Sequence, residues 1–141
     1  MAIVKRETDY ALRSMLRLAE TDDFLSVNAL AEDVEVPESF LRKIMQRLNQ
    51  AGFVESRQGP FGGYRLAAPA EDVSLLDIIE TVQGPLVMNE CFAEPDICSR
   101  TEFCPVRVRL AELQVELNAE LAGIRLTDVL EPAGKRGKAR R

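Results

Sequence analysis

A glycine-rich turn that directly follows a polar-faced helix is the feature that most constrains the fold of this chain. The turn, Gln58-Gly59-Pro60-Phe61-Gly62-Gly63, separates two segments, 53–57 and 64–67, that are typical of short strands. The helix before it spans about 37–50, with Pro37 in its first turn and Gly52 just past its end. A polar-faced helix followed by such a hairpin predicts a recognition helix with a wing.

The segment 37–50 has one apolar face and one polar face. Leu41, Ile44 and Leu48 are spaced three and four residues apart, which is typical of a buried helical stripe. The opposite face carries side chains of the kinds that hydrogen-bond base edges and phosphates in DNA. The expected groove contacts are Arg42, Lys43 and Gln46, the expected phosphate contacts are Ser39 and Arg47, and the wing residues expected near the minor groove are Gln58 and Gly59.

The remaining periodic segments predict a mainly α-helical chain with one small β-hairpin. A first helix spans about 8–20 with Thr8 as its N-cap, and Ser26 caps a short second helix that ends near Val34. Another helix begins at Ser74 and ends at Gly84-Pro85. A long helix follows from Pro105 to about residue 122, and a short element closes the chain at 124–130. In this order the elements match a winged helix-turn-helix with an added long helix.

The chain divides into four parts on this basis. Residues 1–84 form the winged helix-turn-helix domain, and residues 85–104 form a segment that holds all three cysteines. Residues 105–131 contain the long helix and the closing helix. Residues 132–141 carry five basic and no acidic residues, so we expect a disordered tail that adds either nonspecific DNA affinity or solubility.

The charge is unevenly distributed, which reconciles an acidic chain with a DNA partner. The formal net charge is −5, but residues 38–65 carry five basic and two acidic side chains. Residues 67–131 carry four basic and thirteen acidic side chains. A locally basic surface on an acidic body still attracts phosphates, because electrostatic attraction acts over about 10 Å at 0.1 M salt.

The three cysteines, with no histidine in the chain, define the candidate metal chemistry. Cys91, Cys98 and Cys104 are separated by six and five residues. Three thiolates from one segment could hold an iron–sulfur cluster or zinc, and two could form a regulatory disulfide that leaves the third as a reactive thiol. Buried free cysteines are a fourth reading. The spacing alone favours the cluster and leaves the others open.

Several classes of protein are excluded or disfavoured by the same composition. Without histidine the chain has no Ser-His-Asp triad and no Cys-His dyad, and no acid–base pair indicates an enzyme or a small-molecule substrate. No apolar run is long enough to span a membrane, and the start of the chain is not a signal peptide, so we expect a cytoplasmic protein without a membrane partner. An electron-transfer protein and an accessory protein of cluster assembly remain as competing classes.

Taken together, these residues resemble the bacterial family of iron–sulfur winged-helix regulators that includes IscR, NsrR and RirA. The resemblance covers about residues 2–131, and NsrR is the member that the chain resembles most. The motifs that carry it, besides the three-cysteine segment, are Thr8-Asp9-Tyr10-Ala11-Leu12-Arg13, Gly59-Pro60-Phe61-Gly62-Gly63-Tyr64-Arg65-Leu66 and Leu126-Thr127-Asp128-Val129-Leu130.

The resemblance implies a homodimer that binds a double-stranded DNA operator and pairs through its long helix. It also implies a cluster held by the three cysteines and a variable fourth ligand. In IscR that ligand is a histidine, and Arg107 stands at its position here. In NsrR it is an aspartate from the first helix of the other subunit, and Asp9 matches it, with Glu90 or another acid of the cysteine segment as the alternative.

These implications define the function expected of the chain. The match to NsrR at Asp9 implies a 4Fe–4S rather than a 2Fe–2S cluster, and Arg13 would hold the Asp9 carboxylate in place. The expected function is a cluster-dependent transcriptional regulator, a repressor by preference. It would sense nitric oxide, redox state or iron status. The alternative is a winged-helix regulator without a cluster that responds to a thiol–disulfide change or to zinc.

Overall fold

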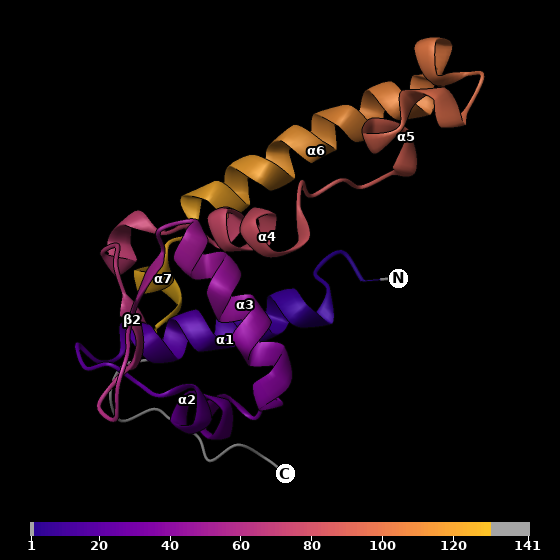
Figure 1. The fold of residues 1–141 in the computed structure, drawn as a ribbon. Helices are drawn as coiled ribbons and strands as arrows, with labels where there is room; N and C mark the ends of the chain where they lie inside the picture. Colours follow the sequence, from indigo (N-terminus) through magenta and orange to yellow (C-terminus); the bar gives the residue numbers. More distant parts are fainter. Residues whose placement is uncertain (1, 131–141) are drawn as a thin grey trace.

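The computed structural model describes residues 2–130, so the tail at 132–141 lies outside the described residues. The described chain is mainly helical, with one two-stranded antiparallel sheet (Figure 1). This confirms the predicted fold class. The helices are α1 (Arg6–Ala19), α2 (Val27–Val34), α3 (Glu38–Gln50), α4 (Leu75–Gln83), α5 (Glu90–Ala93), α6 (Pro105–Gly123) and α7 (Leu126–Val129), the strands are β1 (Val54–Arg57) and β2 (Gly63–Leu66), and the 3-10 turns are η1 (Ala70–Asp72), η2 (Pro95–Ile97) and η3 (Thr101–Phe103).

The hydrophobic core lies between α1, α2, α3 and α4, whose apolar stripes face one another. Met15 and Leu18 of α1 are fully buried, and so are Leu41 and Leu48 of α3. The predicted stripe of α3 is therefore the buried face of that helix. Each fully buried large apolar side chain contributes about 1.5–3 kcal/mol by leaving water, so this core holds α3 firmly in place.

Two predicted helix starts need correction and two are confirmed. Helix α1 begins at Arg6, and Thr8 is not its N-cap but a fully buried residue inside the helix. Pro37 is the N-cap of α3 and does not lie in its first turn. Ser26 accepts a hydrogen bond from the backbone N–H of Ala29, as a cap does. Ser74 caps α4 and forms a reciprocal capping box with Asp77.

The wing is a tight hairpin whose base is fixed to the body. Val54 pairs with Leu66 and Arg57 with Gly63, and an additional bridge joins Tyr64 to Leu25 just before α2. Gly63 has a φ of +142°, and a Cβ atom there would lie 2.0 Å from the carbonyl oxygen of Leu25. Only glycine lets the returning strand approach this closely. The wing is thus placed beside the helix-turn-helix by backbone contact.

The long helix α6 lies across α4 and continues beyond the body of the protein (Figure 1). None of its residues is fully buried in the single chain. The leucines of α6, from Leu110 to Leu121, are half-buried, whereas Val106, Val108 and Val115 are more than 60% exposed. Within residues 2–130, no helix is both long and apolar enough to cross a membrane.

The closing helix α7 returns to the body rather than following α6. The backbone N–H of Leu126 donates to the carbonyl of Val73 at 3.0 Å, and the Leu126 side chain is fully buried in the core. Arg125 pairs with Ser74 in an isolated bridge. The end of the described chain is therefore part of the same core as residues 6–84, although the sequence placed it with the long helix.

Replacing Gly63 by alanine should destabilise the protein markedly. The new Cβ would clash with the Leu25 carbonyl, and the positive φ would be strained, so we expect a loss of at least about 2 kcal/mol in the free energy of unfolding. The matched control is Gly59→Ala, where φ is +99° but no atom lies within 4 Å. It should lose only about 1 kcal/mol. Urea unfolding followed by circular dichroism measures both, and equal losses would contradict the close approach at Gly63.

Candidate DNA interface and cysteine cavity

The polar face of α3 is open along its length. Arg42, Lys43 and Gln46 are exposed, as is Ser39 near the start of the helix, while Leu41 and its stripe are buried. Arg42 is paired with Glu38 one turn earlier on the same helix. Lys43 makes no ion pair with any residue described in the structure, so its ammonium group is available to an external partner. The arrangement can present a row of hydrogen-bond donors to the major groove.

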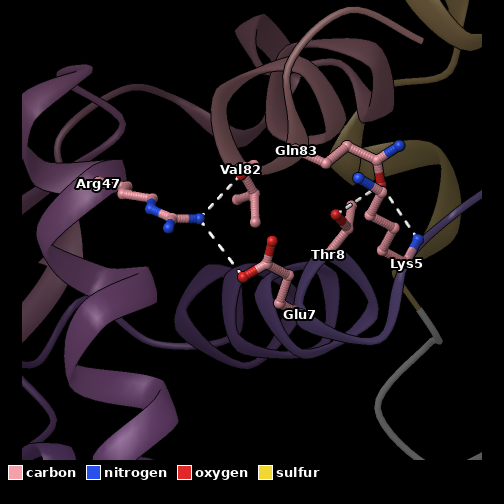
Figure 2. A network of polar contacts seen from close by, with 6 residues as sticks. All are labelled: Lys5, Glu7, Thr8, Arg47, Val82 and Gln83. Carbon is pink, nitrogen blue, oxygen red and sulfur yellow. Dashed lines mark hydrogen bonds and ion pairs between the residues drawn. The ribbon is translucent and has the colours of Figure 1, made fainter. Parts of the chain in front are cut away.

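Arg47 differs from the other predicted DNA contacts because it binds other parts of the body (Figure 2). Its Nη1 donates to the carbonyl oxygen of Val82 at 2.9 Å and lies 3.4 Å from a carboxylate oxygen of Glu7. The carbonyl belongs to the last turn of α4, where helical carbonyls lack partners within the helix. Arg47 therefore joins α3 to α4 and α1. Sequence reasoning had no signal for these long-range partners.

Gln83, the last residue of α4, binds the start of α1 (Figure 2). Its Oε1 accepts hydrogen bonds from the Thr8 hydroxyl at 2.7 Å and from the backbone N–H of Lys5 at 3.1 Å. Its Nε2 donates to the carbonyl of Ile3 at 2.9 Å. The N–H of Lys5, the N-cap residue of α1, thus has an acceptor in α4, although the Lys5 side chain itself caps no backbone N–H.

The wing contains a basic cluster that the sequence analysis did not single out. The guanidinium groups of Arg57 and Arg65 lie 4.2 and 4.4 Å from the ring centre of Phe24, one from each strand. Arg57 also donates to the carbonyl of Phe61 at 2.9 Å. Gln58 and Gly59 are exposed at the tip of the hairpin. The one available signal was that a basic residue occupies each strand.

The three cysteines line one cavity of about 340 Å³ between the start of α6 and the turns before it. Its remaining lining comes from Asn89, Glu90, Ile97, Thr101, Val106 and Arg107. All three thiols are free, with Cys98 exposed and Cys91 and Cys104 half-buried. The segment 85–104, which has no clean period in the sequence, forms the short turns α5, η2 and η3 that bring the cysteines to the same cavity.

The donor set of this cavity fits a thiolate-bound metal or cluster. Cys104 is the N-cap of α6, and its Sγ accepts the backbone N–H of Arg107 at 3.4 Å. The Sγ of Cys98 likewise accepts the N–H of Arg100 at 3.5 Å. Backbone N–H groups thus face two of the three sulfur atoms. The residue types in the cavity suit such a group. Among residues 2–130, however, no three cysteine or acidic side chains lie close enough together to hold a metal ion.

The two predicted carboxylate ligands lie in different places. Glu90 lines the cysteine cavity, whereas Asp9 is on α1 and lies outside it. The Asp9 carboxylate is half exposed and accepts a 2.6 Å hydrogen bond from Arg13 one turn further on. Within a single chain, Asp9 is thus paired with Arg13 and does not line the cysteine cavity.

Comparison with known proteins gives this geometry a context. A sequence profile of the Rrf2 family, described as iron-dependent transcriptional regulators, matches residues 4–132. Protein aau3 of Rhizobium meliloti is 31% identical over 89% of this chain and 83% of its own length. The HTH-type transcriptional regulator NsrR of Bacillus subtilis is 28% identical over 88% of this chain and 87% of its own length.

Solved structures of the same kind share the fold. IscR of T. potens superposes with a TM-score of 0.75 at 25% identity, over 98% of this chain and 93% of the other. CymR of B. subtilis, the global cysteine regulator, superposes with a TM-score of 0.76 at 23% identity, over 92% and 96%. The family profile describes transcriptional regulators, and NsrR and CymR are likewise named as regulators. This chain belongs to the Rrf2 family of winged-helix transcriptional regulators.

Proposed function

We propose that this chain is a homodimeric, iron–sulfur-cluster-dependent regulator that binds a DNA operator and represses transcription. The observation that carries the proposal is the single cavity that Cys91, Cys98 and Cys104 line beside the start of α6. Thiolates are the usual ligands of iron–sulfur clusters, and a bound cluster supplies a group that reacts with nitric oxide or oxygen and changes oxidation state. The similarity to NsrR and IscR supports this choice.

The DNA interface is proposed to be the exposed face of α3 together with the wing. Arg42, Lys43 and Gln46 would contact base edges and Ser39 a nearby phosphate, while Gln58 and Gly59 approach the minor groove. Arg47 would reach a phosphate through the part of its guanidinium group that does not bind the body. A dimer would place two such faces about one helical turn of DNA apart.

The signal is proposed to act through the position of these two faces. Asp9 of one subunit would supply the fourth ligand to the cysteines of the other, and Arg13 would orient its carboxylate. An oxygen ligand at one corner favours a labile 4Fe–4S cluster. Loss of this tie would shift the population away from the conformation that binds DNA.

A second candidate function is a winged-helix regulator without a cluster. The exposed thiol of Cys98 favours it, because an accessible thiol can form a regulatory disulfide or help to bind zinc. Structural likeness to CymR is compatible with either candidate. Protein purified without oxygen separates them. Brown protein with iron and sulfide supports the cluster, and colourless protein with zinc or a disulfide supports the alternative.

Each of the variants Cys91→Ala, Cys98→Ala and Cys104→Ala should lose most of its iron and sulfide when purified without oxygen. The reason is that removing one of three thiolates leaves too few ligands to retain a cluster. Ser99→Ala is the control, since Ser99 belongs to the same segment but does not line the cavity. Unchanged iron content in the cysteine variants would contradict the cluster site. A Cys91→Ala variant that binds its operator and responds to nitric oxide as the parent does would contradict the switch.

Lys43→Ala should weaken specific DNA binding by about 1–3 kcal/mol, which is roughly a 5- to 150-fold loss of affinity. The measurement is a fluorescence-anisotropy titration with a DNA sequence that the parent protein selects from a random library. Arg109→Ala is the matched control, because it removes one positive charge from the exposed surface of α6. Equal affinities for the Lys43 variant and the parent would place the interface elsewhere.

Asp9→Asn should change the Mössbauer spectrum of the cluster and accelerate its loss in air. An amide is a weaker iron ligand than a carboxylate, and it breaks the ion pair with Arg13. Asp33→Asn is the control, since the Asp33 carboxylate accepts a comparable 2.8 Å bond from Arg17 on the surface. A spectrum identical to that of the parent would remove Asp9 from the ligand set and leave Glu90 as the next variant to measure.

A further inference from the structure

Arg107 is a positively charged residue in the wall of the cysteine cavity. Its side chain extends from the first turn of α6, with the guanidinium carbon 5.4 Å from the ring centre of Phe92. The Nε atom of Arg107 is buried and has no hydrogen-bond partner among the described residues. A buried donor without a partner destabilises the protein, so this N–H indicates a missing acceptor.

The surroundings of Arg107 restrict what that acceptor can be. Its own backbone N–H already donates to the Sγ of Cys104, so side chain and backbone lie at the same end of the cavity. Glu90 is the one acidic residue in the lining, and it forms no ion pair with Arg107. The cavity therefore places a cation that has no ion pair among the described residues beside three thiols, and an anionic group would complement it.

We propose that Arg107 donates its Nε–H to the anionic metal–thiolate group held by Cys91, Cys98 and Cys104 and stabilises its negative charge. This inference rests on the proposed function and adds a positioning residue to it. Three thiols that bind a divalent cation release three protons, so the bound group carries a net negative charge. The fixed charge of Arg107 stabilises that group, and hydrogen bonds and nearby charges tune both the affinity and the potential of such sites.

The position of Arg107 agrees with this role. It lies three residues after the last cysteine, in the first turn of a helix whose N-terminal amides already favour negative charge. A side chain that cannot act as a ligand at this position still contributes a hydrogen bond and a charge. The fourth ligand of the proposed metal group would then come from a residue or molecule that does not belong to α6.

The experiment is a titration of the reduced, metal-free protein with Co²⁺, followed by the thiolate-to-cobalt absorption band. We expect Arg107→Gln to bind Co²⁺ about 10- to 100-fold more weakly than the parent, as loss of an outer hydrogen-bond partner does at metal sites. Arg109→Gln is the matched control. It makes the same charge change two residues further along α6, where Arg109 is exposed and paired with Glu112, and it should bind like the parent.

The outcomes separate this inference from the function on which it rests. Equal Co²⁺ affinities for Arg107→Gln and the parent would overturn the role of Arg107, with the cysteine site intact. A parent protein without a cobalt–thiolate band would contradict the cysteine site itself. Arg107→Lys keeps the charge and loses the Nε–H, so its Co²⁺ affinity should lie between those of the parent and Arg107→Gln. It also replaces Arg107→Gln as the test if circular dichroism shows that the glutamine variant is unfolded.

Discussion

The polar contacts at the carboxyl end of α4 fix the parts of this protein relative to one another. In that turn the carbonyl of Val82 accepts a hydrogen bond from Arg47 of α3, and Gln83 binds the start of α1 through three hydrogen bonds. Groups at a helix end lack partners within the helix, so side chains from two other elements can bind there without breaking helical hydrogen bonds. The contacts are worth little singly, but together they hold three helices at one point.

That point is also where the cysteine segment begins. Gly84 follows Gln83 with a φ of +84°, and Leu86, two residues later, is buried, so the segment leaves the body along a fixed path. Asp9 lies on the same α1 that Gln83 holds, one residue after Thr8. The elements that would hold a cluster and the helix that would read DNA thus share one anchor. In the proposed mechanism, a displacement of the cysteine segment relative to α1 would act on the residues that position α3.

The elements that sequence could predict are those whose determinants are local. The stripe of Leu41, the cap at Ser26 and the glycines of the wing each act within a few residues, and the structure contains all of them. Thr8 was misassigned because a polar residue near a helix start is typical of a cap, whereas its partner is 75 residues away. Arg47 was predicted to contact a phosphate because it lies beside the polar face of its helix. Its partners, Val82 and Glu7, come from other elements.

The cysteine cavity depends on both local sequence and contacts between distant elements. Spacings of six and five residues match no short ligand motif, so the sequence could propose shared chemistry for the thiols but not a shared location. The location depends on three short turns that lack the periodicity of longer helices, and on α6, whose N-terminus supplies both Cys104 and Arg107.

Because the chain has no histidine and no fourth cysteine, α6 can offer this site a charge and a hydrogen bond but no further soft ligand. A cluster held there, as proposed, would need an oxygen donor or an exogenous ligand as well, and such a bond to iron would be easier to break than a thiolate bond. The absence of histidine from the chain is therefore consistent with the proposal of a labile, sensing centre.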